Sequence, residues 1–279
     1  MRLANVNNRA VIVVGDEIAD VATASDGRFG PDPMSLFDDW AAFVAFAATV
    51  TAGTAPLVMA DLANPVPRPP QVFGIGLNYR SHAEESGMTV PSIPATFTKF
   101  PSSLTGPFAD VELAGATVDW EVELVAVIGS RADRVAEADG WKHIAGLTVG
   151  QDVSERTVQF AAAGQFSLGK SFRGFGPMGP WLVTLDEFAD PGNLGLSCSI
   201  DGVTVQDART NDLIFDVPRL VAELSRVLPL LPGDVIFTGT PAGVGGSMKP
   251  PRFLQPGEVV ESWIEGIGTI RNRFVAPAG

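Results

Sequence analysis

Three acidic side chains, Asp119, Glu121 and Glu123, alternate with apolar ones at the start of a hydrophobic segment. On a β-strand alternate residues share a face, so these carboxylates fall on the side opposite Trp120. Residues 124–128 then continue without a charge, which indicates a buried strand. Carboxylates that lead into a buried strand need a cation, and a hard divalent ion such as Mg²⁺ or Mn²⁺ suits oxygen ligands. A half-exposed strand with a solvated acidic face is the alternative that these residues leave open.

A third carboxylate, Asp152, follows the apolar stretch 144–149 and therefore stands at the end of another predicted strand. Taken alone, Asp152 is interpreted as the N-cap of the helix that follows. It becomes a candidate metal ligand only in combination with Glu121 and Glu123.

His82 lies in residues 76–85, a glycine-containing entry to a polar helical turn. Glu85 is three residues further on and shares its helix face, whereas Glu84 does not. A carboxylate bonded to one imidazole nitrogen raises the basicity of the other, which suits a general base. An exposed His–Glu pair without a chemical role is the alternative. The other histidine, His143, is interpreted as structural.

Residues 164–171 satisfy the nucleotide-binding pattern G-x-x-x-x-G-K-[ST]. That loop binds phosphates only when a helix begins at its lysine. Here Lys170 is followed by three glycines and two prolines between Gly174 and Pro180, which prevent a helix. We therefore set nucleotide binding aside and interpret Lys170 as a cation on a constrained loop that could face a developing oxyanion.

The composition excludes several other functions. A net charge of −13, from 32 acidic and 19 basic residues, disfavours nucleic acid as a partner. The single cysteine, Cys198, excludes an intramolecular disulfide and favours the cytoplasm. The most apolar run, residues 40–50, is far shorter than the roughly 20 residues of a membrane-spanning helix. We expect no membrane association.

The elements that must position these residues are mostly strands. Residues 1–65 are predicted to form a small N-terminal α/β domain, with two strands in 10–22 and a helix over 34–50, followed by a proline-rich linker at 64–71. In the domain predicted over residues 72–279, strands are expected at 118–128, 194–200, 234–238 and 258–264. Helical patterns are fewer, at 81–86, 135–142, 156–163 and 217–228. This favours a β-rich mixed α+β fold over a doubly wound sheet.

Eight motifs, in the same order along the chain, resemble those of the fumarylacetoacetate hydrolase family. They are Gly76–Tyr79 with His82, Asp119–Leu124, Gln151–Ser154, Gly169–Phe172, Gly179–Trp181, Pro232–Ile236, Thr238–Gly245 and Leu254–Gly257. The resemblance covers residues 72–275 and implies a mixed β-sandwich or roll, a homodimer, and a bound Mg²⁺, Mn²⁺ or Ca²⁺. It also implies a small 2-oxo acid as substrate.

The resemblance also assigns roles to individual residues. It implies metal ligation by Glu121, Glu123 and Asp152, catalysis by His82, Glu85 and Lys170, and substrate contacts from Arg156, Gln159 and Thr240. The implied activity is hydrolysis of the C–C bond of an acylpyruvate-like 2,4-dioxo acid through an enolate. Isomerisation of 2-hydroxyhepta-2,4-diene-1,7-dioate and decarboxylation of oxaloacetate are the alternatives on the same site.

Overall fold

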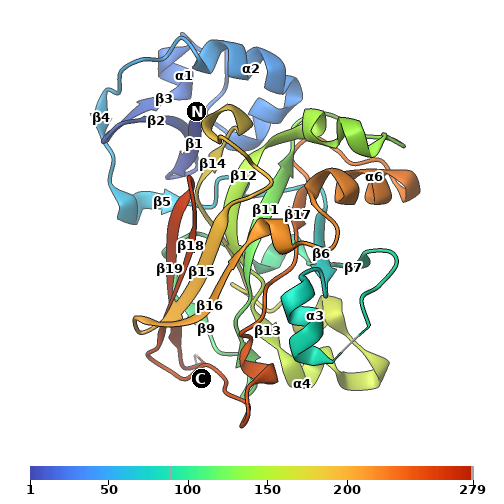
Figure 1. The fold of residues 1–279 in the computed structure, drawn as a ribbon. Coiled ribbons are helices and arrows are strands. Elements are labelled where there is room, and N and C mark those ends of the chain that lie inside the picture. The colour runs from blue at the N-terminus through green and yellow to red at the C-terminus, as the bar shows by residue number, and fades with distance from the viewer. Residues whose placement is uncertain (88, 278–279) are drawn as a thin grey trace.

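A computed structural model describes residues 1–87 and 89–277, and its core is a large mixed sheet packed against a smaller one (Figure 1). The twelve strands of the large sheet are β1 (Arg2–Val6), β2 (Arg9–Val14), β3 (Glu17–Asp20), β4 (Ala55–Pro56), β5 (Leu62–Ala63), β6 (Val72–Gly76), β7 (Ala95–Thr98), β8 (Leu104–Thr105), β11 (Val122–Ile128), β12 (Ile144–Gln151), β14 (Gly176–Val183) and β17 (Val235–Phe237). Their main order is β4-β3-β2-β1-β14-β12-β11-β17-β6-β7.

Five strands form the second sheet, in the order β16-β15-β18-β19-β9, and two more form a short ladder. These are β9 (Val111–Glu112), β15 (Gly195–Ile200), β16 (Val203–Arg209), β18 (Val259–Ile264) and β19 (Gly268–Val275), with β10 (Val118–Asp119) and β13 (Ser154–Glu155) in the ladder. The second sheet packs on the middle of the first, because β15, β18 and β19 contact β11, β12 and β14.

The helices are short, and η1 and α2 pack on one face of the large sheet. The α-helices are α1 (Val21–Ala24), α2 (Trp40–Ala47), α3 (Arg80–Ser86), α4 (Arg156–Gln159), α5 (Phe166–Gly169) and α6 (Val217–Val227). The 3-10 helices are η1 (Pro33–Asp39), η2 (Met59–Asp61), η3 (Pro101–Ser103), η4 (Glu137–His143), η5 (Ala161–Ala163), η6 (Leu185–Glu187), η7 (Thr210–Asp212) and η8 (Gly245–Ser247). In Figure 1, α3 and α4 lie at the lower right, below β6 and away from β18 and β19.

Strand β11 is buried along its whole length because both of its faces are covered. Val122, Leu124 and Ala126 belong to the core between the two sheets. Val125 and Val127 belong to a second core, which also contains apolar side chains from the first 47 residues. A strand covered on both faces has a continuously apolar sequence, as residues 124–128 do.

The N-terminal segment extends the large sheet. Strand β1 pairs antiparallel with β14, with Arg2 opposite Val183, and β2, β3 and β4 follow outward. Residues 64–71 contain no regular structure, as their prolines predict. The division into domains at residues 1–65 and 72–279 stays a prediction.

The predicted β-rich mixed α+β fold is confirmed, with differences in individual elements. The strand predicted over 118–128 is interrupted at Trp120 and Glu121. The helix predicted over 135–142 is the 3-10 helix η4. Of the helix predicted over 156–163, only α4 is regular, because Ala162 adopts a left-handed φ of 46°. Strand β14 has no counterpart among the predictions, since its glycines and prolines are typical of turns.

Among the described residues, no helix is both long and apolar enough to cross a membrane. The longest α-helix there, α6, has 11 residues and is amphipathic. Cytoplasmic location and homodimer formation stay predictions.

Asp234 precedes β17 and is buried. Its Oδ2 accepts hydrogen bonds from the Leu231 N–H at 2.7 Å and from Gln71 Nε2 at 2.6 Å. Within the described part of the chain, its Oδ1 has no hydrogen-bond partner. Burial raises the pKa of this carboxyl to about 6, although both hydrogen bonds oppose the rise.

We predict that Asp234→Asn removes a pH-dependent loss of stability. The folded-state pKa lies above the unfolded value of about 3.9, so the folded chain binds more protons between the two values. The contribution of Asp234 to stability therefore falls as pH rises from about 4 to 6. Thermal melts should show the Tm of Asp234→Asn rising relative to wild type between pH 4 and 7. The exposed Asp207→Asn is the control, and a parallel profile of Asp234→Asn and wild type would contradict the expectation.

Candidate active site

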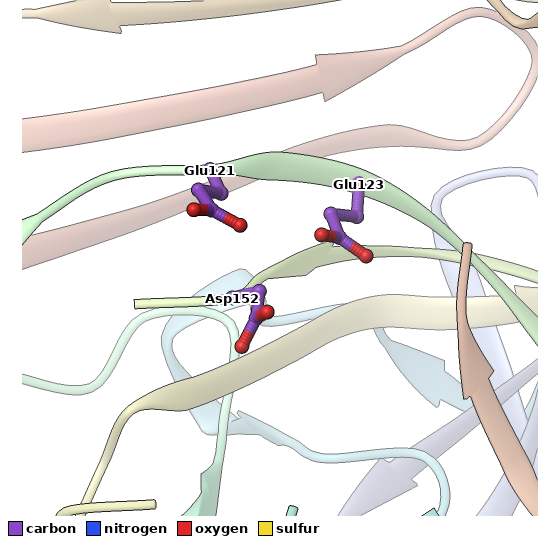
Figure 2. Close-up of side chains that lie close together, drawn as sticks. All are labelled: Glu121, Glu123 and Asp152. Carbon is purple, nitrogen blue, oxygen red and sulfur yellow. The ribbon is translucent and has the colours of Figure 1, made fainter. Parts of the chain in front are cut away.

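Three buried carboxylates converge beside the middle of the large sheet. Glu123 lies on β11, Glu121 directly precedes that strand, and Asp152 directly follows the neighbouring β12. One oxygen from each lies within 4.8 Å of the others. Figure 2 shows Glu121 and Glu123 extending from one chain segment toward Asp152 on the next. The structure thus brings together the three residues predicted as metal ligands.

Side-chain amides make this convergence possible where the backbone ladder is interrupted. The Glu121 N–H donates to Gln151 Oε1 at 2.8 Å, and the Val122 N–H donates to Gln206 Oε1 at 3.0 Å. The Asp152 N–H in turn donates to the Glu121 carbonyl at 2.9 Å. Because side-chain amides satisfy the N–H groups of Glu121 and Val122, the regular ladder can be interrupted at Glu121 without an unpaired donor.

Lys170 supplies a positive charge that contacts two members of the triad. Its Nζ lies 2.8 Å from Glu121 Oε2, 2.6 Å from Asp152 Oδ2 and 2.8 Å from Ser154 Oγ. Arg156 Nη2 lies 2.7 Å from Glu121 Oε1. Burial opposes ionisation of Glu121, but Lys170 and Arg156 together lower its pKa to about 2. This carboxylate is therefore ionised in the folded protein.

Lys99 is a second buried cation at the site, and the sequence reasoning missed it. Its Nζ donates to Asp152 Oδ1 at 2.6 Å, to the Phe175 carbonyl at 3.1 Å and to the Lys170 carbonyl. Burial lowers the pKa of Lys99, and the Asp152 carboxylate opposes that shift. The sequence signals it only by a single lysine that directly follows the residues of β7.

Asp119 does not join Glu121 and Glu123, although strand alternation predicts one shared face. The interruption before β11 turns it away, and its Oδ1 accepts the Gly245 N–H at 2.7 Å. Its Oδ2 accepts from Arg156 Nε at 2.8 Å. Asp119 thus holds the guanidinium that pairs with Glu121.

The charges around the triad fit a divalent cation. Four buried carboxylates face three cations, and the members of this set are Asp119, Glu121, Glu123, Asp152, Lys99, Lys170 and Arg156. Glu123 accepts the Gly239 N–H at 2.8 Å. Burial, followed by the charges of Asp152 and Glu121, raises its pKa well above the usual range. The charge of Lys170 offsets this rise in pKa only in part, so a further cation would stabilise the ionised Glu123. An all-oxygen donor set suits Mg²⁺ or Mn²⁺.

The predicted His82–Glu85 pair forms on α3. His82 Nδ1 lies 3.4 Å from Glu85 Oε2, and Glu85 Oε1 accepts the Gly243 N–H at 3.1 Å. The positive charge of His82 also lowers the pKa of Glu121, after the larger effects of burial, Lys170 and Arg156. The imidazole therefore lies near the triad.

Asn78 fixes the entry to α3. Its Nδ2 donates to the carbonyls of Phe215 at 2.9 Å and Thr238 at 2.7 Å, and its Oδ1 accepts the Phe215 N–H at 2.9 Å. The preceding Leu77 adopts a left-handed φ of 53°, a backbone conformation that residues other than glycine rarely adopt. These bonds hold the turn that leads the chain from β6 into the His82 helix.

The residues predicted to contact substrate lie around the same triad. Arg156 Nη1 donates to Gln159 Oε1 at 2.8 Å, so both lie on the Glu121 side. Thr240 Oγ1 donates to the Val122 carbonyl at 2.9 Å. Thr240 therefore contacts the backbone of β11 directly, and its role toward a substrate stays a prediction.

The prediction that no helix begins at Lys170 is confirmed, whereas the absence of nucleotide binding at residues 164–171 stays a prediction. Helix α5 ends before Lys170, whose N–H closes its last turn on Phe166, and no helix begins there. The lysine side chain points instead to Glu121 and Asp152.

Residues 71–275 match the family described as "Fumarylacetoacetate (FAA) hydrolase C-terminal". The chain belongs to the fumarylacetoacetate hydrolase family. Members of this family are enzymes that hydrolyse, isomerise or tautomerise small oxo acids, and the fold described above is that of the family.

Known members of the family are similar over most of the chain. Human mitochondrial oxaloacetate tautomerase FAHD2A is 45% identical over 214 residues, which are 76% of this chain and 68% of the human protein. An HpcE-like protein of Mycobacterium smegmatis has a solved structure with a TM-score of 0.95 and 50% identity, covering 100% of both chains. Maleylpyruvate hydrolase from Sphingobium sp. SYK-6, solved with manganese(II) and pyruvate, has a TM-score of 0.83 and 30% identity, covering 100% of both chains.

We predict that Lys99→Met destabilises this family member by about 3 kcal/mol, because it leaves a buried carboxylate and two carbonyls short of a donor. Urea unfolding of the metal-free protein measures the change. The same substitution at the exposed Lys142, whose ammonium lies 2.6 Å from Asp139 Oδ1, is the control and should cost little. Equal midpoints for Lys99→Met and Lys142→Met would show that Lys99 does not compensate Asp152.

Proposed function

We propose that the chain is a divalent-metal-dependent hydrolase that cleaves the C–C bond of an acylpyruvate-like 2,4-dioxo acid. The observation that carries the proposal is the buried triad of Glu121, Glu123 and Asp152, with Lys170 bonded to it. The His82–Glu85 contact on α3 and the electrostatic effect of His82 on Glu121 support the proposal. A general base, a cation and an oxygen-ligand metal site together match the requirements of this hydrolysis.

The residues that would hold the metal are Glu121, Glu123 and Asp152, and Mg²⁺ or Mn²⁺ is the proposed ion. When bound, the ion would supply Lewis acidity that stabilises negative charge on the pyruvate enolate. The manganese(II) and pyruvate in the maleylpyruvate hydrolase structure support this choice.

His82 is the proposed general base. With its Nδ1–H directed to Glu85, the lone pair of the ring lies on Nε2. Nε2 takes a proton from water, whose oxygen adds to the 4-carbonyl carbon of the substrate. The bond between C3 and C4 then breaks, the acyl group leaves as a carboxylic acid, and C3 of the enolate gains a proton to give pyruvate.

Lys170 and Arg156 are the proposed electrostatic partners of the substrate. Burial disfavours the Lys170 ammonium, but Asp152 and Glu121 raise its pKa above the ordinary value. It therefore stays protonated and can stabilise the oxyanion that forms on the 4-carbonyl. Arg156 pairs with Asp119 and donates to Gln159, and it is the proposed partner of substrate oxygen atoms.

A second candidate is tautomerisation of oxaloacetate, which the name of the human relative favours. That reaction needs the enolate-stabilising groups but no attacking water. Product analysis by NMR distinguishes the candidates, because an acylpyruvate yields pyruvate and a carboxylic acid, whereas oxaloacetate only changes between its keto and enol forms.

We predict that Glu121→Gln weakens metal binding and hydrolysis together. Loss of one ligand charge should reduce Mn²⁺ affinity by more than about tenfold, measured by isothermal titration, with a comparable loss of acylpyruvate hydrolysis at limiting metal. Chelation of the wild type should abolish turnover, and added Mn²⁺ should restore it. The exposed Glu17→Gln is the matched control. Unchanged affinity and rate in Glu121→Gln would refute the metal assignment.

We predict that His82→Gln lowers kcat by about 10²- to 10⁴-fold, because the general base is lost. Mn²⁺ affinity should be retained, since His82 is not among the proposed ligands. His143→Gln is the matched control, because His143 precedes β12 and contacts Ser130, whereas Asp152 follows the other end of that strand. Wild-type kcat in His82→Gln would exclude the proposed base.

A further inference from the structure

A row of three aromatic side chains leads outward from the candidate active site. The ring centroids of Phe97 and Phe166 are 6.0 Å apart, and those of Phe166 and Phe160 are also 6.0 Å apart, nearly edge to face. Exposure increases along the row, from 37% of Phe166 to 64% of Phe160. Large exposed aromatic side chains next to a catalytic site are typical of surfaces that bind a ligand or a partner.

Phe97, at the inner end of the row, lies beside the ammonium group of Lys170. Lys170 Nζ lies 5.2 Å from the centroid of the Phe97 ring. The Phe97 ring packs on Gly74 of β6, where an added Cβ would lie 2.3 Å from the ring. Phe97 is therefore held in place beside the ammonium that is proposed to stabilise the oxyanion.

A hollow of about 380 Å³ lies beside this row. It is lined by residues 95–97, by residues 164–167 and by Gly76 on the segment that leads to α3. None of the described residues that line the hollow carries a charge. The nearby cations Lys170 and Arg156 are already paired with Glu121, Asp152 and Asp119.

We propose that the aromatic row and the hollow bind the distal acyl group of the substrate and select an apolar group, aryl or branched alkyl, over one that ends in a carboxylate. This inference rests on the proposed hydrolysis, because the 4-carbonyl must lie near Lys170 and the acyl group continues beyond it. An apolar group gains from contact with the three rings. A carboxylate in the same place would lose water without gaining a partner of opposite charge.

The test compares three 2,4-dioxo acids, with phenyl, methyl and carboxyethyl groups on the 4-carbonyl, in the Mn²⁺-loaded enzyme. We expect kcat/KM of the wild type to be highest for phenyl and lowest for carboxyethyl. Phe166→Ala should lower kcat/KM for the phenyl substrate about tenfold, mainly through KM, and leave the methyl substrate nearly unchanged. Trp263→Ala, an exposed aromatic residue of β18 in the second sheet, is the control.

A second variant tests the same inference as a gain of function. Gln165 lines the hollow, and Gln165→Arg places a cation there. It should raise kcat/KM for the carboxyethyl substrate about tenfold relative to the phenyl substrate. Thermal stabilisation of the protein by non-cleavable 2-oxo acids with the same three groups should follow the same order, without turnover.

Several results would overturn the inference. One is a wild-type preference for the carboxyethyl substrate, and another is an equal loss for all three substrates in Phe166→Ala. A change in oligomeric state with unchanged specificity would assign the row to a partner chain instead. If no dioxo acid is cleaved, the proposed hydrolysis fails, and the order of thermal stabilisation then decides the inference about the apolar group separately.

Discussion

Burial of like charges is the constraint on which the centre of this protein depends. Glu121, Glu123 and Asp152 lie within a few ångströms of one another and away from water. Such a cluster is unfavourable unless cations approach it closely. Lys170 and Lys99 do so from segments far apart in the chain, so the folding of the large sheet and the assembly of the site are one process.

The part of the site that is local in sequence could be predicted. Glu121 and Glu123 are two residues apart, and the spacing of His82 and Glu85 places them on one helical turn. Lys99 could not be found in this way, because its meaning depends on Asp152, 53 residues away. A lysine after a strand is ordinarily solvated, and only the three-dimensional structure shows that this one is buried.

The fold shows the same limit. Apolar runs such as 124–128 predicted strands correctly, because burial on both faces leaves a direct trace in the sequence. The interruption of the strand at Trp120 and Glu121 could not be read from the local sequence. The freed N–H groups are satisfied by the side-chain amides of Gln151 and Gln206, which belong to other strands. Strand β14 was not predicted for a related reason. Its glycines and prolines are typical of turns, and the contacts that allow them in a strand come from other parts of the chain.

Strand β7 contributes both to the wall of the hollow and to the position of Lys99. This combination limits how the substrate preference of the fold can change in evolution. The strand carries Phe97 on the wall of the hollow, and Lys99 follows it directly to bind Asp152. An insertion or deletion in this strand would displace the buried ammonium while reshaping the wall. The segment 160–168 supplies residues 164–167 of the lining and none of the ion pairs with the triad. New substrate preferences are therefore accessible in evolution, or in a directed library, through that segment, while β7 stays conserved in length.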